Sequence, residues 1–124
     1  MFVRENLNPA GKNVGDCVIR AISKVLNQSW WRTFLDLAVY GYAMCDLQSA
    51  DAVWGRYLCD RGMKKSVLPA ECPNCTTVKE FAEYNKVGKF LLYVGEHVVA
   101  CVDGNYYDTW DSGDRIVIYF FEGN

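Results

Sequence analysis

The sequence has little positive charge and no long apolar run, and each shortage excludes a class of protein. Its 13 Lys and Arg residues stand against 15 Asp and Glu residues, which leaves a net charge of −2. A chain of this charge is poorly suited to displacing counterions from phosphates, so we expect no nucleic-acid partner. No apolar run approaches the roughly 18 residues that a membrane-spanning helix requires, so we also expect no membrane partner.

A secretory leader and a disulfide framework are also not expected. Residues Met1 to Asn6 lack the basic and then apolar layout of a signal peptide, which favours a cytoplasmic location. The six cysteines are even in number, yet in a cytoplasm we expect them to be reduced thiols. At 124 residues and 51% hydrophobic composition, the chain can bury a core without such bridges. We therefore predict one domain over residues 1–124.

Hydrophobic periodicity divides the chain into a helical first part and a last part made of strands. Apolar residues repeat at helical spacing from Asp16 to Asn27, whereas runs typical of strands follow Gly88. The pattern predicts an irregular segment over 1–15, helices over 16–27, 29–41, 49–60 and 77–85, and strands over 90–94, 97–102, 105–110 and 116–121. This order indicates an α+β fold, with the helices packed on an antiparallel sheet of about four strands.

Cys17 stands where the chain changes from loop to helix. Asp16 is a good N-cap residue, so Cys17 is expected in the first turn of the helix. Unpaired backbone N–H groups and the positive end of the helix dipole favour a thiolate over a thiol at such a position. Cys17 is therefore a candidate nucleophile, although a small buried cysteine is the structural alternative.

His97 is the single histidine, so any cysteine–histidine chemistry must use it. Asp103-Gly104 between apolar runs is a strong hairpin signal. A two-residue turn there pairs Val99 with Asp108 and places Trp110 opposite His97. Because side chains alternate between faces, His97, Asp108 and Trp110 share one face of the sheet. Asp108 can then accept a hydrogen bond from the histidine ring, as an acid does in an activated-nucleophile site.

Two segments carry a resemblance to a known superfamily. "GDCVIRAIS" opens a helix at Gly15, and "HVVACVDGNYYDTWDSG" follows about eighty residues later, beginning at His97. Together they resemble the papain-like cysteine peptidases, and most nearly the small bacterial and phage-borne members that include bacteriocin-processing peptidases. The resemblance implies a papain-like fold in the cytoplasm of a bacterium or a phage-infected host cell.

The resemblance also implies a role for each residue. Cys17 would be the nucleophile, His97 the general base and acid, and Asp108 the group that orients the histidine, with Trp110 shielding their contact. Such an enzyme would cleave a peptide, isopeptide or related amide bond in a peptide or protein substrate, without a metal or other cofactor. The superfamily usually has a Gln six residues before the cysteine, where this chain has Gly11. Asn13 is the best substitute for this oxyanion-hole donor.

Two other functions are compatible with the sequence. The chain could keep the fold without turnover and act as a phage-encoded module that binds or inhibits a host protein. It could instead be a small zinc-stabilised interaction domain, because Cys72-Pro73-Asn74-Cys75 supplies half of a zinc site, which Cys45 and Cys59 could complete. Of the remaining notable residues, Trp54 and the Trp30-Trp31 pair are expected in the core or over the sheet, and Cys101 in the core.

Overall fold

The computed structural model describes residues 1–123 of the chain. Four helices and six strands lie within this described part, and the α+β class is confirmed. The helices are α1 (Cys17–Leu26), α2 (Trp30–Met44), α3 (Asp51–Asp60) and α4 (Val78–Tyr84). The strands are β1 (Phe2–Arg4), β2 (Lys64–Val67), β3 (Lys89–Tyr93), β4 (Val98–Val102), β5 (Asn105–Asp108) and β6 (Tyr119–Glu122).

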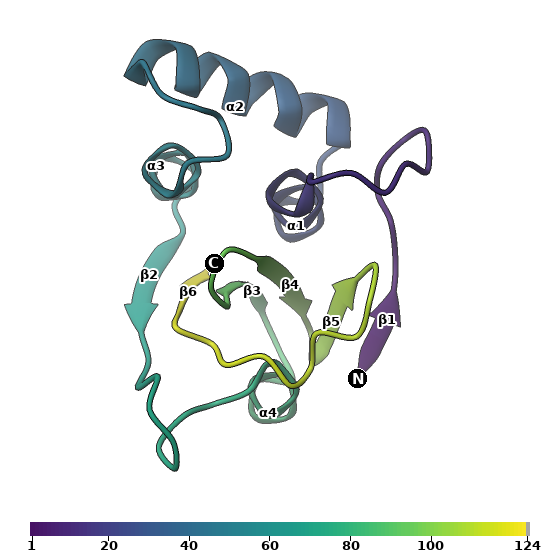
Figure 1. Ribbon diagram of the computed structural model, residues 1–124, viewed down its shortest axis with the longest axis vertical. Helices are drawn as coiled ribbons and strands as arrows, with labels where there is room; N and C mark the ends of the chain where they lie inside the picture. Colours follow the sequence, from purple (N-terminus) through teal and green to yellow (C-terminus); the bar gives the residue numbers. More distant parts are fainter. Residues whose placement is uncertain (124) are drawn as a thin grey trace.

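The strands form one mixed sheet in the order β1-β5-β4-β3-β6-β2 (Figure 1). β1 runs parallel to β5, and the other neighbours are antiparallel. The expectation of about four antiparallel strands is therefore wrong, because β1 and β2 were not predicted. β1 is only three residues long, and β2 reads Lys-Lys-Ser-Val, without the alternation of a half-buried strand. Both are edge strands that depend on pairing with a neighbour.

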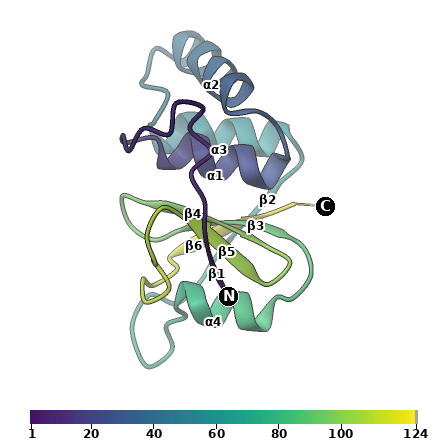
Figure 2. The ribbon, with the colours of Figure 1, turned by 90° about the vertical axis from the view of Figure 1, so that its right-hand side faces the viewer.

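The helices cover both faces of the sheet. Figure 2 shows α1, α2 and α3 stacked on one side and α4 alone on the other. Ile22, Trp54 and Leu91 belong to the core on the first side, whereas Leu92 and Cys101 belong to the core on the α4 side. Adjacent residues of β3 thus face opposite cores, as the two-residue period of a strand requires. The predicted burial of Trp54 and Cys101 is confirmed.

The hairpin between β4 and β5 has the predicted register. Val102 pairs with Asn105 and Cys101 with Tyr106. Asp103 and Gly104 have φ of 50° and 82°, and a type I′ turn needs positive φ at both of its central residues. β4 begins at Val98 and β5 ends at Asp108, so His97 and Trp110 lie just beyond the paired strands rather than in them.

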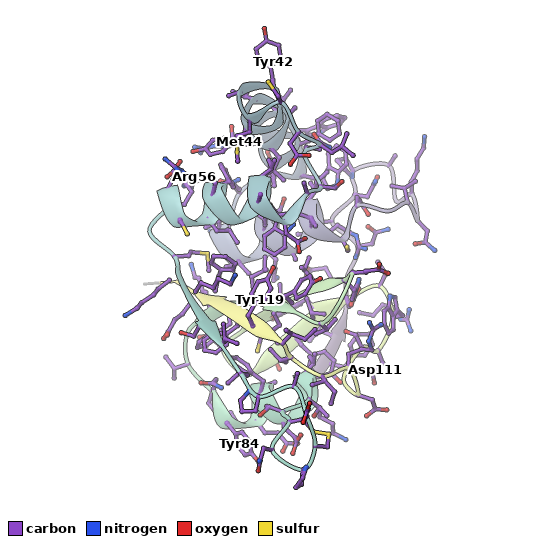
Figure 3. All side chains as sticks on the ribbon, turned by 60° about the vertical axis from the view of Figure 1, so that its left-hand side comes forward. Tyr42, Met44, Arg56, Tyr84, Asp111 and Tyr119 are labelled. Atoms are coloured by element: carbon purple, nitrogen blue, oxygen red, sulfur yellow. A yellow bond between two sulfur atoms is a disulfide. The ribbon has the colours of Figure 1, made fainter. Side chains whose placement is uncertain are left out.

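Two expectations about surface and oxidation are corrected. Cys72 and Cys75 form a disulfide, whereas the other four cysteines of the described chain are free. The loop that contains this disulfide leads into α4. It lies at the opposite end of the molecule from α2, where Tyr42 points into solvent (Figure 3). Trp30 packs against the core on the α1–α3 side, whereas Trp31 is 63% exposed and belongs to neither core. Within residues 1–123, no helix is long and apolar enough to cross a membrane.

Candidate active site

The first turn of α1 carries Cys17 as its first helical residue. Asp16 precedes it, but its carboxylate does not cap the helix within the described chain. Instead it accepts hydrogen bonds from Arg20 Nε at 2.8 Å, Trp30 Nε1 at 2.9 Å and Asn8 Nδ2 at 3.1 Å. The first N–H groups of α1 are therefore not capped by the Asp16 side chain. Their partial positive charge favours a negative charge at the start of the helix, such as that of a Cys17 thiolate.

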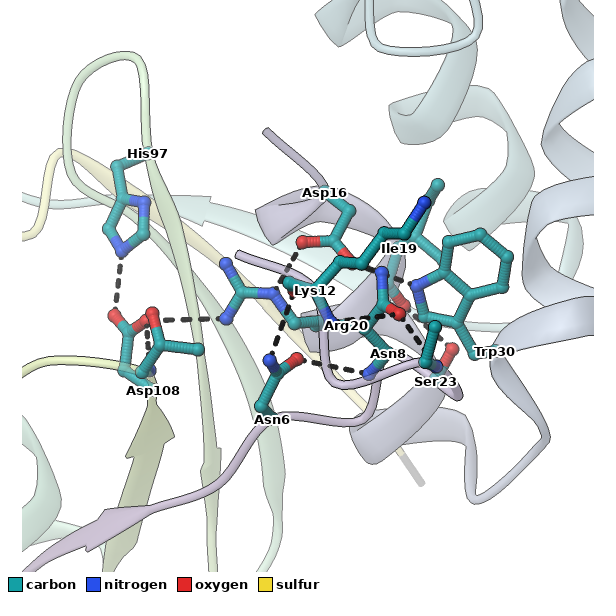
Figure 4. A network of polar contacts seen from close by, with 12 residues as sticks. Asn6, Asn8, Lys12, Asp16, Ile19, Arg20, Ser23, Trp30, His97 and Asp108 are labelled. Atoms are coloured by element: carbon teal, nitrogen blue, oxygen red, sulfur yellow. Dashed lines mark hydrogen bonds and ion pairs between the residues drawn. The ribbon is translucent and has the colours of Figure 1, made fainter. Parts of the chain in front are cut away.

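His97 meets Asp108 at the end of the hairpin. Its Nε2 lies 2.7 Å from Asp108 Oδ2, the contact drawn at the left of Figure 4. The ring of Trp110 lies against the imidazole, with centroids 5.0 Å apart and planes 30° apart. His97 and Asp108 therefore make the predicted contact, and Trp110 covers one side of it. Because Nε2 is taken by the carboxylate, Nδ1 is the nitrogen free to serve a second group.

Asp108 is held by more groups than the sequence indicated. Its carboxylate, 2% exposed, accepts hydrogen bonds from Ser112 Oγ at 2.9 Å and from the Thr109 backbone N–H at 2.8 Å. Arg20 Nη1 lies 3.5 Å from the other carboxylate oxygen. Burial works to raise the pKa of Asp108, but the contacts with His97, Ser112 and Thr109 outweigh it and lower the pKa. Asp108 is thus a fixed anion beside the imidazole.

Cys17 and His97 perturb each other's pKa in opposite directions. Burial works to raise the pKa of the Cys17 thiol, but hydrogen bonds from His97 and the Val98 backbone N–H lower it. Burial works to lower the pKa of His97, but the hydrogen bonds to Asp108 and Cys17 raise it to about 9. Charge attraction between the two groups acts in the same directions. Both shifts favour a thiolate paired with an imidazolium over the neutral thiol and imidazole.

Arg20 connects the two acids of the site and was not identified from the sequence. It lies one turn after Asp16 and Cys17 on α1, between Asp16 and Asp108, as Figure 4 shows. Its side chain is only 10% exposed. The spacing of Asp16 and Arg20 was a usable signal, because an Asp and an Arg four residues apart on a helix form an ion pair. The contact with Asp108 depends on tertiary packing and has no signal in the sequence.

A pocket of about 250 Å³ opens beside the cysteine and the histidine. Its wall is formed by residues before and within α1, at the start of α3 and in the β3–β4 turn: Gly15, Cys17, Val18, Ser49, Asp51, Trp54, Tyr93, Glu96, His97 and Val98. Asn13, the predicted oxyanion donor, is exposed and lies outside this described lining. The side-chain amide of Asn8, in the same segment before α1, is bonded to Asp16. Ser49 and Tyr93 are the residues of this wall that carry a hydroxyl group.

No metal site is found among the residues that the structure describes, where no three His, Cys, Asp or Glu side chains are grouped to hold an ion. Cys72 and Cys75 are bonded to each other. Their sulfur atoms are therefore not the thiolates that a structural zinc site requires. The chemistry that the described site can perform is that of a thiol and an imidazole.

Comparison with known proteins identified no relative of this chain. No protein-family model, no curated protein and no solved structure matches the chain. The resemblance to papain-like peptidases accordingly stays a prediction from the two sequence segments around Cys17 and His97.

Proposed function

We propose that this protein is a papain-like thiol hydrolase that cleaves a peptide, isopeptide or related amide bond through Cys17, His97 and Asp108. The observation that carries the proposal is the chain of contacts at the site. Cys17 begins α1 and lines one pocket together with His97 and Val98, the two neighbours that lower the pKa of its thiol, while Asp108 Oδ2 lies 2.7 Å from His97 Nε2. A nucleophile, a base and an orienting acid thus follow one another.

The reaction follows from these contacts. The Cys17 thiolate attacks the carbonyl carbon and forms a sulfur–carbon bond, and the carbonyl oxygen becomes an oxyanion. In this proposal the Cys17 backbone N–H binds that oxyanion, and a hydroxyl from the same pocket wall, that of Ser49 or Tyr93, is the second donor. His97 gives its Nδ1 proton to the amide nitrogen as the carbon–nitrogen bond breaks. Water then loses a proton to His97 and attacks the acyl carbon, which releases the acid and restores the thiolate.

The first experiment measures the reactivity of each thiol within the same molecule. Wild-type protein is treated with iodoacetamide at pH 6, and the alkylation of each cysteine is followed by peptide mass spectrometry. We expect Cys17 to react at least tenfold faster than the exposed Cys45 and Cys59, because its neighbours lower the pKa of the Cys17 thiol. Cys101 is the negative control, since it is buried and its pKa is raised to about 11.

The second experiment tests whether the protein cleaves peptides and whether that cleavage requires Cys17. Wild-type protein and the Cys17→Ala variant are incubated with a mixture of short peptides, and new termini are identified by mass spectrometry. We expect cleavage by the wild type alone. If Cys17 reacts no faster than Cys45 and Cys59, the hydrolase proposal is wrong. If Cys17 is reactive but no amide is cut, and host proteins bind equally well to Cys17→Ala, the silent binding module is favoured instead.

A further inference from the structure

A second pocket, of about 500 Å³, lies next to the first and has a different character. It is bounded by the loop before α1 and by the first turns of α1 and α2. Its lining, which is mostly apolar, consists of Asn8, Pro9, Ala10, Lys12, Val14, Gly15, Asp16, Ile19, Trp30, Trp31, Phe34 and Gln48. The size and the apolar walls with a few polar groups are typical of a site for an organic ligand.

Three aromatic rings form the outer wall of this aromatic pocket. Trp30 stacks on Phe34 with centroids 5.2 Å apart, and Trp31 meets Trp30 edge-on at 5.3 Å. The rings are nevertheless left open, since Trp31 is 63% and Phe34 37% exposed. Removing this apolar surface from water is favourable, so the pocket will bind an apolar group of matching size.

The aromatic pocket and the candidate active site meet at one shared residue. Gly15 lines both pockets, and it stands two residues before the nucleophile Cys17. Trp30 donates its indole N–H to Asp16 Oδ2 at 2.9 Å, and Asp16 is the residue directly before Cys17. A chain bound across Gly15 can therefore place one group in the aromatic pocket and another beside the thiolate.

The loop that forms the inner wall is already held in place. Asn8 Oδ1 accepts a hydrogen bond from the Ala10 backbone N–H at 2.9 Å, while Asn8 Nδ2 donates to Asp16 Oδ2 at 3.1 Å. Lys12 and Gln48 stand in the same lining with side-chain donors that can bind the carbonyl groups of a peptide. A pre-formed wall requires little ordering when a ligand binds, which favours affinity.

We infer that the aromatic pocket is the specificity subsite of the enzyme and binds an aromatic or branched aliphatic side chain of a peptide substrate. The inference rests on the proposed function, since it takes the occupant to be part of the chain that Cys17 attacks. Apolar rings select an apolar side chain, and the shared Gly15 places that side chain within a few residues of the scissile amide.

Binding can be tested without catalysis. In the Cys17→Ala protein labelled with nitrogen-15, the Trp30 indole N–H signal is followed while N-acetyl-L-phenylalaninamide or N-acetyl-L-serinamide is added. We expect saturable shifts with the phenylalanine probe and at least tenfold weaker binding of the serine probe. Adding Trp31→Ala should weaken binding at least fivefold. Leu35→Ala is the matched control, because Leu35 is also on α2 and 62% exposed but lies outside the described lining, and it should change nothing.

Substrate preference is tested with hexapeptides of Ser and Gly that carry one Phe at each position in turn. We expect the wild type to cut at least tenfold faster when Phe occupies one particular position, and Trp31→Ala, but not Leu35→Ala, to remove that preference. Cleavage without any preference for Phe, or no binding of the phenylalanine probe, overturns the inference and leaves the hydrolase standing.

Two further outcomes separate this inference from the proposed function. Binding of the phenylalanine probe by a protein whose Cys17 is unreactive and which cuts no peptide overturns the hydrolase, while the apolar ligand of the pocket stands. Self-association of the wild-type chain that Trp31→Ala abolishes would assign the aromatic pocket to a second copy and overturn the inference.

Discussion

At the scale of single residues, Arg20 joins the start of α1 to the acid behind His97. It binds Asp16 at 2.8 Å and lies 3.5 Å from Asp108, and its positive charge also helps to lower the pKa of Cys17. It does not contact the reacting sulfur through any described hydrogen bond, so we regard it as a positioning residue. Its effect should therefore be seen in the titration of the pair that it supports.

We predict that Arg20→Gln slows the alkylation of Cys17 at pH 6 about tenfold, because a hydrogen bond between charged groups contributes about 1.5 kcal/mol or more. Arg20→Lys keeps the charge and should recover part of the rate. The control is Arg32→Gln, which removes another Arg–Asp pair of the same helical spacing, at 3.5 Å, on the exposed side of α2. An equal loss in both Gln variants, or an unchanged pH profile in Arg20→Gln, would contradict this role.

The pH dependence of the site has a defined sign. The lowered pKa of Cys17 keeps its thiolate present below the ordinary pKa of a thiol, and the raised pKa of His97 keeps the imidazolium present up to about 9. Activity should therefore fall toward acid as Cys17 is protonated and toward alkali, near pH 9, as His97 loses its proton.

The single histidine allows a direct measurement by NMR. We predict that the ring signal of His97 titrates with a midpoint near 9. Asp108→Asn and Cys17→Ala should each move the midpoint to lower pH, because each removes a group that raises the pKa of His97. A wild-type midpoint at or below the ordinary value of 6.5 would exclude the ion pair.

The contact between His97 and Asp108 could be predicted because a two-residue turn leaves no freedom in the register of the hairpin. The position of Cys17 could also be predicted, because the helical repeat of apolar residues begins directly after Asp16, although the Asp16 side chain does not cap the helix. Arg20 and Ser112 could not be assigned to Asp108. Their contacts depend on how α1 and the segment after β5 pack on the sheet, which leaves no local pattern.

At the scale of elements, strong local signals account for what could be predicted. α4 begins with a complete capping box: Thr77 Oγ1 accepts from the Glu80 N–H at 3.1 Å, and Glu80 Oε1 accepts from the Thr77 N–H at 2.9 Å. β1 and β2 have no such signal. β2 in particular carries exposed Lys64 and Lys65, which suit an edge strand because they discourage pairing with another chain.

Removing the capping threonine should destabilise the protein through α4. We predict that Thr77→Ala lowers the free energy of unfolding by about 1 kcal/mol, as measured by urea denaturation. Thr76→Ala is a suitable control, because among the described residues the Thr76 side chain makes no hydrogen bond. A loss of similar size in both variants would show that capping is not the cause.

At the scale of the whole molecule, the sheet separates two groups of features. The candidate site and the aromatic pocket are lined by residues in and beside α1 and near the starts of α2 and α3. Figures 2 and 3 show α4, with the Cys72–Cys75 disulfide near it, at the other end of the molecule. The α+β class could be predicted from the order of the patterns. The number and order of strands could not, because the outer strands pair with partners far away in the sequence.

This separation predicts that the disulfide affects stability but not the site. Cys72→Ser combined with Cys75→Ser should cost at most about 2 kcal/mol, because the bridge closes a very short loop. The alkylation rate of Cys17 should be unchanged. Urea denaturation and peptide mass spectrometry measure the two effects, and a slower reaction of Cys17 in the double variant would show that the two ends are coupled.

The order in which the site residues occur along the chain has a consequence for protein synthesis. Cys17 leaves the ribosome early, whereas His97 and Asp108 follow much later. β6 is made last, and it then has to pair with both β3 and the edge strand β2. A growing chain therefore carries its cysteine without the imidazole and the carboxylate that hold it as a thiolate. Cys17 of the nascent protein should therefore react no faster than an ordinary thiol until the segment through Asp108 has been made and has folded.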